Sequence, residues 1–531
     1  MKSILKKLFV LTLLITTILV SSACKPGESS EPTDNLPQLN IIDDKYRNWY
    51  EIFVYSFYDT NNDGYGDLNG VTKKLDYIKD MGYNGIWLMP ICPSPTYHKY
   101  DVKDYYQIDE AYGTLDDFKN LMTEAHKRGI KVIVDLVVNH SSSEHPWFKE
   151  AYSYVQKNQK TDGLYCDYYN FTTTPSTLGF TKVNGTNYYY ESRFWSGMPD
   201  LNLDSENVRN EIVNIMSYWL KDLGADGFRL DAVTSYYTGN VPKNVEFLSW
   251  LNTEAKKIKP DCYIVGEAWV GSDYEINRYY QSGIDSFFLF TGSQATGSIA
   301  SVVKQQSGNS LGKLMVSLQN TYGENAILAP FLGNHDTMRP GSFMPGVENV
   351  KMAAGVMAML NGGCFVYYGE EIGMISKDGS NSDPHKRIAM YWSNKSVYEG
   401  WCYNTPENIK IDDTYYYYPS VEEQLQDEQS ILNYYKMAMR LRNAFPSIAR
   451  GKVTDYSSNY SSYVCVVTKE YAGELITIVI NLDSFEQNIS LDQSALNVTS
   501  IAGELYATNE GKATLNGTNL VIPPYAIVIL K

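Results

Sequence analysis

Residues 131–140 read KVIVDLVVNH. Apart from Lys131 and Asp135 the run is apolar, until the polar pair Asn139 and His140 ends it. A strand with one face in water alternates polar and apolar residues, whereas a parallel strand buried on both faces reads as a continuous apolar run. The stretch therefore predicts a buried parallel strand that ends at Asn139 and His140.

Further apolar runs repeat this pattern between residues 45 and 375. They are EIFVYSF (51–57), NGIWLMPI (84–91), DGFRLDAV (226–233), YIVGEAW (263–269), DSFFLF (285–290), ILAPFLG (327–333) and GGCFVYYG (362–369). Segments with a helical pattern separate the runs. Eight strand–helix units predict an α/β fold, a (β/α)8 TIM barrel, and a doubly wound sheet is the alternative.

Two of the intervening segments carry clear helix signals. Thr114 can cap a helix that Gly129 ends, and another helix ends at Gly224. Apolar residues recur at helical spacing in both segments. They are Phe118, Leu121, Met122 and Ala125 in the first, and Val208, Ile212, Ile215 and Trp219 in the second.

The domain organisation follows from where this rhythm breaks. We expect a barrel over 45–140 and 205–446, interrupted by a small irregular domain at 141–204, because long loops are normally functional insertions. From residue 447 to 531 the pattern has period 2 (YVCVVT, ELITIVINL, NLVIPPYAIVIL), which predicts a C-terminal antiparallel β-sandwich.

The N-terminus has the layout of a secretory signal. Lysines precede a short apolar run, Leu8 to Val20, and small residues follow up to Cys24. The end of the signal resembles a bacterial lipoprotein cleavage box, with Ser21 in place of the usual leucine. We expect a signal peptide at 1–23 and a polar tether at 24–44. The protein would then be extracellular, attached to the outer face of the bacterial membrane through a lipid on Cys24, and a monomer.

Composition narrows the possible partners. The chain has 45 Lys+Arg and 61 Asp+Glu, a net charge of −16, which argues against nucleic acid. The 45 tyrosines indicate either an aromatic core or stacking faces for sugar rings. The six cysteines after Cys24 have no CxxC spacing, so we expect buried free thiols.

Polar residues gather where the predicted strands end, which is where a TIM barrel carries its catalytic groups. They are Asn139, His140, Arg229, Asp231, Glu267, His335 and Asp336. Residues two apart on a strand share a face, so Arg229 and Asp231 project to the same side. A buried cation beside a buried anion is costly unless it has a function.

Four motifs at these strand ends resemble the conserved regions of the α-amylase family, glycoside hydrolase family thirteen. They are DLVVNH (135–140), GFRLDAV (227–233), GEAW (266–269) and GNHD (333–336), in the family's order and spacing. MPDLN (198–202) resembles a fifth region of the family. Its form is the one seen in members that are intermediate between oligo-1,6-glucosidases and neopullulanases. The resemblance runs from residue 45 to the C-terminus and implies the same domain layout.

The resemblance also implies roles for single residues. Asp231 would be the nucleophile, Glu267 the general acid and then base, and Asp336 would favour the distorted transition state. The substrate-binding candidates are Tyr100, Asp101, His140, Arg229 and His335. We expect Arg229 to keep Asp231 ionised, Asp135 to orient Arg229, and an apolar setting beside Trp269 to raise the pKa of Glu267.

The segment DTNNDGYGD (59–67) places oxygen ligands at alternate positions, with Gly64 for the turn, as calcium requires. Similar loops bind Ca²⁺ in many family members. The ligand candidates are Asp59, Asn61, Asp63, the carbonyl of Tyr65, and Asp67. A polar turn without metal is the alternative.

Residues after the nucleophile bear on which bond is cleaved. In the family a small residue there, here Ala232, accompanies α-1,4 cleavage, and valine accompanies α-1,6 cleavage. Thr234 and Ser235 stand where many α-amylases have lysine and histidine. We expect endohydrolysis of α-1,4 bonds in starch and maltodextrins; a neopullulanase-like or α-glucosidase activity with transglycosylation is the alternative. A non-catalytic glucan-binding lipoprotein is the hypothesis from another class.

Overall fold

The computed structural model describes residues 37–531 except 177, 378–382, 458, 493–495 and 497. The predicted signal peptide, Cys24 and most of the predicted tether lie outside the described residues. Within the part that is described, no helix combines the length and the hydrophobicity that a membrane span requires. The unit considered below comprises Leu39–Lys531.

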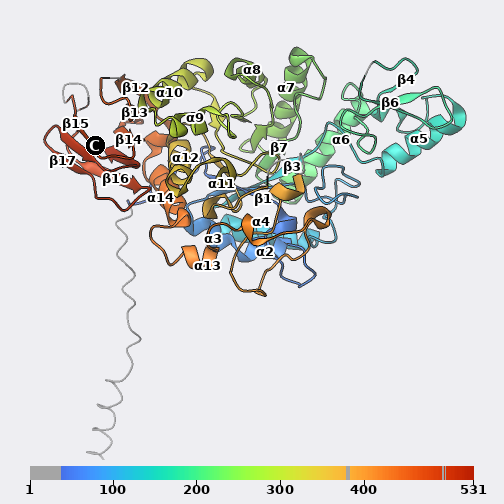
Figure 1. Ribbon diagram of the computed structural model, residues 1–531. Helices are drawn as coiled ribbons and strands as arrows, with labels where there is room; N and C mark the ends of the chain where they lie inside the picture. The colour runs from blue at the N-terminus through green and yellow to red at the C-terminus, as the bar shows by residue number, and fades with distance from the viewer. Residues whose placement is uncertain (1–36, 177, 378–382, 458, 493–495, 497) are drawn as a thin grey trace, which may run out of the picture. The chain divides into compact units, whose positions relative to one another are not determined.

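Eight parallel strands form the centre of the fold, in the order β10-β9-β8-β7-β3-β2-β1-β11 (Figure 1). Their bounds are β1 Trp49–Ile52, β2 Gly85–Leu88, β3 Lys131–Leu136, β7 Gly227–Leu230, β8 Tyr263–Gly266, β9 Ser286–Phe288, β10 Ile327–Ala329 and β11 Phe365–Tyr367. A parallel bridge between Phe331 and Phe365 links the two outer strands, so the sheet curls into a nearly closed TIM barrel. Each predicted run overlaps one strand, although β1 begins two residues before the run 51–57 and Val54–Ser56 form a short 3-10 helix instead. The doubly wound alternative is wrong.

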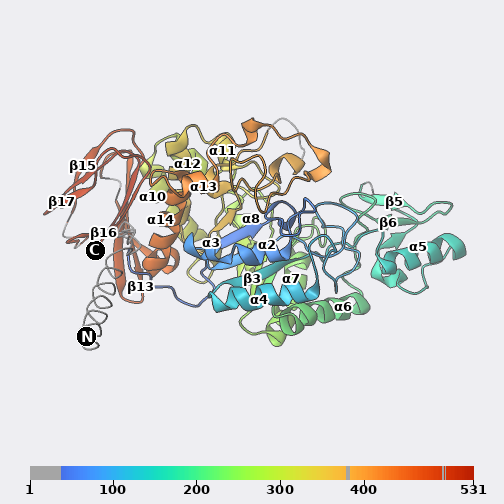
Figure 2. The same ribbon diagram turned by 90° about the horizontal axis from the view of Figure 1, so that it is seen from below.

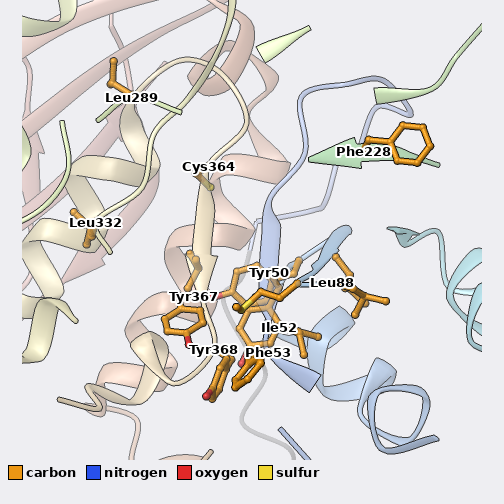
Figure 3. Packing of buried hydrophobic residues seen from close by; sticks show 14 of the residues in the cluster. Tyr50, Ile52, Phe53, Leu88, Phe228, Leu289, Leu332, Cys364, Tyr367 and Tyr368 are labelled. Atoms are coloured by element: carbon orange, nitrogen blue, oxygen red, sulfur yellow. The ribbon is translucent and has the colours of Figure 1, made fainter. Parts of the chain in front are cut away.

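Alternation along the strands sorts side chains between the barrel interior and the helices. In β1, Trp49 belongs to a cluster inside the barrel, whereas Tyr50 and Ile52 belong to the cluster between strands and helices (Figure 3). In β7, Phe228 faces the helices in the same way. Full burial of such a side chain stabilises the fold by about 1.5–3 kcal/mol. The interior cluster is rich in aromatic rings: Trp49, Trp87, Ile133, Tyr263, Val265, Phe288, Phe290, Ala329, Phe331 and Phe365.

Helices lie on the outside of the strands (Figure 2). Their bounds are α2 Leu68–Lys73, α3 Leu75–Asp80, α4 Leu115–Lys127, α6 Glu206–Ser217, α7 Val241–Ile258, α8 Asp273–Tyr279, α9 Ser298–Lys304, α10 Gly308–Tyr322, α11 Pro340–Phe343, α12 Val347–Met359, α13 Val421–Gln424, α14 Ile431–Ala444 and α15 Pro446–Arg450. Thr114 caps α4 through Asp117 N–H, as predicted. Gly129 and Gly224 have φ of 74° and 82°, the left-handed conformation in which a helix ends.

The long segment between β3 and α6 has its own elements, coloured teal in Figure 1. It holds α5 Pro146–Asn158 and a small antiparallel sheet of β4 Phe171–Thr172, β6 Tyr189–Glu191 and β5 Phe180–Lys182. All of them fall within the range 141–204. Phe148 packs edge-on against Tyr169 and Tyr190, which fixes α5 on this sheet.

Two antiparallel sheets end the chain. One has the order β12-β13-β14-β19-β16 and the other β15-β18-β17. Their strands are β12 Lys452–Ser457, β13 Val464–Tyr471, β14 Glu474–Asn481, β15 Gln487–Ser490, β16 Ile501–Tyr506, β17 Thr514–Asn516, β18 Asn519–Ile522 and β19 Ala526–Leu530. In β19, Val528 packs between the two sheets, whereas Ile527 and Ile529 join the core of the barrel. Burial on both faces explains why this strand is wholly apolar.

A buried lysine connects the larger C-terminal sheet to the barrel. Lys469 in β13 is fully buried, and its Nζ donates to the carbonyls of Met359 and Ile448 and to Asn361 Oδ1, each at 2.8 Å. Three acceptors match the three donors of an ammonium group. Burial lowers the pKa of Lys469, whereas the end of α12 at Met359, the negative end of that helix dipole, favours the charged form.

The six described cysteines are all buried and free, as predicted.

Candidate active site

A cavity of about 480 Å³ opens where the barrel strands end. Its lining comes from the strand-end loops and from the segment between β3 and α6. The lining residues are His98, Tyr100, His140, Phe194, Trp195, Met198, Asp231, Ala232, Thr234, Ser235, Glu267, Trp269, Asp336, Asp383 and Arg387. The three predicted catalytic carboxylates therefore share one cavity.

One buried guanidinium joins two of these carboxylates. Arg229 is fully buried, and its Nη1 lies 2.7 Å from Asp231 Oδ1 and 3.0 Å from Asp135 Oδ1. Its Nη2 lies 3.1 Å from Glu267 Oε2. Asp231 and Glu267 thus lie side by side on one cation, and the prediction that Asp135 orients Arg229 is confirmed.

The buried environment of Glu267 changes the pKa of its carboxyl group. Burial raises the pKa of Glu267 to about 7; Arg229 opposes this shift, and the negative charges of Asp231 and Asp336 add to it. A carboxyl group with that pKa still holds its proton in a large fraction of molecules near neutral pH. Glu267 can therefore donate a proton while a neighbouring carboxylate acts as a nucleophile.

The residue after Asp231 holds Glu267 in place. Ala232 N–H donates to Glu267 Oε2 at 2.8 Å. Ala232 has φ of 47°, in the left-handed region that β-branched residues adopt only with strain. A small side chain at this position is thus favoured by the backbone itself. Thr234 and Ser235 follow and line the cavity with short hydroxyl side chains.

His335 is held between two carboxylates. Its Nδ1 lies 2.6 Å from Glu51 Oε1, and its Nε2 lies 3.0 Å from Asp336 Oδ2 and 2.7 Å from the hydroxyl of Tyr100. Burial alone would lower the pKa of His335, but Asp336 and then Glu51 raise it to about 9. The imidazole is therefore charged at neutral pH.

Asp336 is stabilised as an anion from two sides. Arg387 Nη2 lies 2.8 Å from its Oδ1, and the charged His335 contacts Oδ2. Although burial opposes the effect, these two cations hold the pKa of Asp336 below its ordinary value. Arg387 Nη2 also lies 3.3 Å from Asp383 Oδ2, and its Nη1 lies 3.3 Å from Tyr97 Oη. These contacts hold Arg387 in the lining of the cavity beside Asp336.

The predicted substrate-binding residues take three positions. Tyr100 and His140 line the cavity, whereas Arg229 and His335 lie beneath it, fully buried. Asp101 is also fully buried, but its Oδ1 accepts from Ser94 Oγ at 2.7 Å and it is not part of the lining. The structure thus brings together all of these residues except Asp101, which holds a loop.

Several site residues escaped the sequence analysis. Glu51 is an acid inside the apolar run WYEIFV (49–54), and its place on the inward face of β1 was a signal that could have found it. Arg387 lies in DPHKRIAMYW (383–392), which resembles an arginine-bearing stretch of the glucosidase-like branch except at Ile388 and Ala389, but the resemblance gave Arg387 no role in the site. Phe194 and Trp195 reach the cavity from the irregular segment, where no periodicity marks them.

The proposed calcium loop has its carboxylates turned toward its own backbone. Asp59 accepts from the N–H groups of Asn62 and Gly64, at 2.7 and 2.8 Å. Asp67 caps α2 and accepts from Gly70 N–H at 2.7 Å. Asn61 Nδ2 donates to Asp63 Oδ2 at 3.0 Å, so these two ligand candidates are adjacent. Among the described residues no group of three or more His, Cys, Asp or Glu is arranged as a metal site, and calcium stays a prediction.

The chain is similar to known proteins over most of its length. The family model for the alpha amylase catalytic domain matches residues 51–451. Alpha-amylase 3 of Dictyoglomus thermophilum is 37% identical over 92% of this chain and 93% of its own. Oligo-1,6-glucosidase of Heyndrickxia coagulans is 30% identical over 90% of this chain and 97% of its own. The structure of Eubacterium rectale Amy13B superposes with a TM-score of 0.88, at 42% identity over 93% of this chain and 97% of that one. With a nearly closed barrel, three carboxylates in one cavity and these similarities, the chain belongs to the α-amylase family of glycoside hydrolases.

Proposed function

We propose that this protein is a retaining glycoside hydrolase that cleaves internal α-1,4-glucosidic bonds of starch and maltodextrins. The observation that carries the proposal is the pair of carboxyl groups on one buried guanidinium, Asp231 at 2.7 Å and Glu267 at 3.1 Å. A nucleophile and an acid side by side are what double displacement requires. The similarity to an alpha-amylase supports the substrate class.

In the first step the carboxylate of Asp231 attacks the anomeric carbon. The bond from that carbon to the leaving oxygen breaks, and the proton of Glu267 passes to the leaving oxygen, so the shortened glucan departs with a free hydroxyl group. In the second step Glu267, now a carboxylate, takes a proton from water. The water oxygen attacks the same carbon, releases Asp231, and restores the starting state with net retention.

The other residues bind the ring on which this happens. Burial lowers the pKa of His140, so it is neutral, and its buried Nε2 has no hydrogen-bond partner within the described residues. A sugar hydroxyl can supply that partner. Asp336 presents a stable negative charge to the cationic transition state, and Tyr100 supplies an aromatic wall.

The α-1,4 preference rests on the small side chain of Ala232, since a small residue after the nucleophile accompanies α-1,4 cleavage in the family. An α-glucosidase or oligo-1,6-glucosidase activity is the second candidate. It is favoured by the oligo-1,6-glucosidase relative and by the ion pair of Arg387 with Asp383, two residues that line the cavity beside Asp336. A neopullulanase-like activity belongs to the same alternative.

Product analysis tests the proposal. The protein is incubated with soluble starch, panose and pullulan, and products are separated by chromatography. We expect a ladder of maltooligosaccharides from starch. Glucose alone from starch would overturn endo action and favour the second candidate, and no product from any substrate would favour a glucan-binding protein without catalysis.

Two further properties belong to the proposal. We infer that Ca²⁺ stabilises the loop 59–67 through Asp59, Asn61, Asp63, Asp67 and the carbonyl of Tyr65, and does not take part in bond cleavage. We also infer an extracellular, lipid-anchored protein, which rests on the sequence of residues 1–24 alone. Labelling with a radioactive fatty acid, lost on Cys24→Ala substitution, would test the anchor.

A further inference from the structure

Two aromatic rings lie exposed outside the catalytic cavity, on the segment that follows β11. They belong to Trp401 and Tyr403, which are 37% and 48% exposed. Neither residue lines the catalytic cavity, and no step of the reaction proposed above uses them. Cys402 between them is buried, so side chains alternate here as they do along a strand, and the two rings project to the same side.

The segment that carries both rings is fastened to the loop 59–67 at its two ends. Asp59 N–H donates to the carbonyl of Gly400 at 3.1 Å, and Asn404 N–H donates to the carbonyl of Gly64 at 3.0 Å. The backbone on either side of the rings is therefore fixed. A ligand that binds to them does not have to order this segment, which lowers the entropy cost of binding.

Each ring is also held by its own contacts. Tyr403 Oη donates to the carbonyl of Asn62 at 3.1 Å, and its ring packs on Gly64, where a Cβ would lie only 2.5 Å from the ring. Trp401 lies between two tyrosines. Its ring centroid is 5.8 Å from that of Tyr403, with 63° between the planes, and 6.2 Å from that of Tyr398. The exposed pair is therefore a rigid aromatic surface, with the indole N–H as a hydrogen-bond donor beside it.

The groups beside the rings indicate a neutral, hydroxyl-rich ligand. The sequence reads GWCYNT at 400–405 and TNN at 60–62, without a charged residue in either stretch. Nearby carboxylates are engaged, since Asp63 accepts from an amide of its own loop and Glu399 pairs with Lys73. Aromatic faces beside amide and hydroxyl groups suit the apolar face and the hydroxyl edge of a sugar ring. A phosphate or an anionic membrane would need cations here, and the net charge of −16 disfavours both.

The size of the open aromatic surface favours a sugar chain over a protein partner. At about 150–250 Å² for each large aromatic side chain, the exposed fractions of the two rings leave about 150–200 Å² open. A stable interface between proteins needs about 800 Å² on each partner, so a second copy of this chain is disfavoured. Two rings can instead cover two neighbouring glucose units, and the 63° between their planes suits a chain that turns, as an α-1,4-glucan does.

We propose that Trp401 and Tyr403 form a surface site for an α-glucan chain, separate from the catalytic cavity, which holds the enzyme on a polymeric substrate. This inference rests on the proposed function, which supplies the polymer. A glucan held at the surface has a high effective concentration at the cavity, so the site favours polymers over short oligosaccharides and leaves bond cleavage unchanged. The loop 59–67 then has a second role, as the support of this site.

Adsorption to starch granules measures this site without turnover. The starting protein carries Asp231→Asn, which removes the nucleophile and leaves the granules intact, and the dissociation constant is obtained from the protein that stays in solution. Adding Trp401→Ala should weaken adsorption about tenfold, since one ring face is lost. Adding Trp401→Phe, which keeps an aromatic face, should weaken it less than about threefold. Phe485→Ala is the matched control, because Phe485 is an aromatic residue elsewhere on the surface, 72% exposed, and it should change nothing.

The same substitution in the active enzyme separates the surface site from the cavity. Trp401→Ala should keep kcat/KM for maltohexaose within about twofold of the wild type and lower the initial rate on granular starch about fivefold. If Trp401→Ala leaves adsorption within about twofold, or lowers the cleavage of maltohexaose as much as that of granules, the surface site is overturned alone. If the wild-type protein releases no maltooligosaccharide from soluble starch, the proposed function is overturned, whatever the adsorption.

Discussion

The contact between Glu51 and His335 permits a quantitative prediction for Glu51→Gln. The two carboxylates raise the pKa of His335 from 6.5 to about 9. At about 1.36 kcal/mol per unit this corresponds to about 3.4 kcal/mol of stability. Asp336 is the larger source and Glu51 the next, so we assign Glu51 a little under half, about 1.5 kcal/mol. Because the folded-state pKa is the higher one, this stability is complete below about pH 6.5 and is lost as the pH rises through about 9.

Urea unfolding of the wild type and of Glu51→Gln at two pH values measures the effect. At pH 6 the variant should be less stable by about 1.5 kcal/mol more than at pH 10, where His335 is neutral in both proteins. Because about 1.5 kcal/mol is about one pKa unit, His335 stays charged at pH 6 in the variant, and its kcat/KM for maltohexaose at that pH should fall by less than about threefold.

Tyr105→Phe is the matched control. Tyr105 Oη is buried and donates to the carbonyls of Val137 and His140, so its loss should cost about 1 kcal/mol at both pH values. If the difference between wild type and Glu51→Gln is the same at pH 6 and pH 10, Glu51 does not keep His335 charged, and the reasoning is refuted.

Three more predictions follow from the site and the core. Because Glu267 must hold a proton, kcat/KM should fall about tenfold per unit as the pH rises above about 7, and Glu267→Gln should lower kcat about 10²–10⁴-fold; a flat profile to pH 9 would contradict this. A chelator should lower the thermal unfolding midpoint by several degrees in the wild type and not in Asp63→Ala; an unchanged wild-type midpoint would exclude a stabilising ion. Lys469→Met should cost about 3–5 kcal/mol in urea unfolding, since three buried acceptors lose their donor; a loss below about 1 kcal/mol would show that water replaces it.

The barrel was predictable because its strands are buried on both faces. Continuous apolar runs mark such strands, and Gly129 and Gly224 mark where helices must end. The strand ends then located Asp231, Glu267 and Asp336, since parallel strands all deliver their last residues to one rim. Local sequence patterns were therefore sufficient to predict the barrel and the position of these three carboxylates.

The parts of the site that were not predictable depend on long-range packing. Arg387 reaches Asp336 across 51 residues, and Glu51 reaches His335 across 284. No local pattern encodes such pairs. Asp101 illustrates the same limit, because its place beside Tyr100 in the motif suggested substrate contact, whereas its Oδ1 accepts from Ser94 Oγ and its buried Oδ2 has no hydrogen-bond partner among the described residues. Its role in substrate binding stays a prediction.

The ammonium group of Lys469 limits how this enzyme can be taken apart. A fragment ending at Gly451 would look complete in sequence, since it includes the whole matched catalytic region. Yet it would leave the last turn of α12 without the amino group of Lys469 and would expose the part of the barrel core that Ile527 and Ile529 of β19 cover. The two C-terminal sheets are thus no exchangeable module. Anyone who designs chimaeras or a minimal catalyst from this scaffold should carry residues 452–531 along, and place any fusion partner before Leu39.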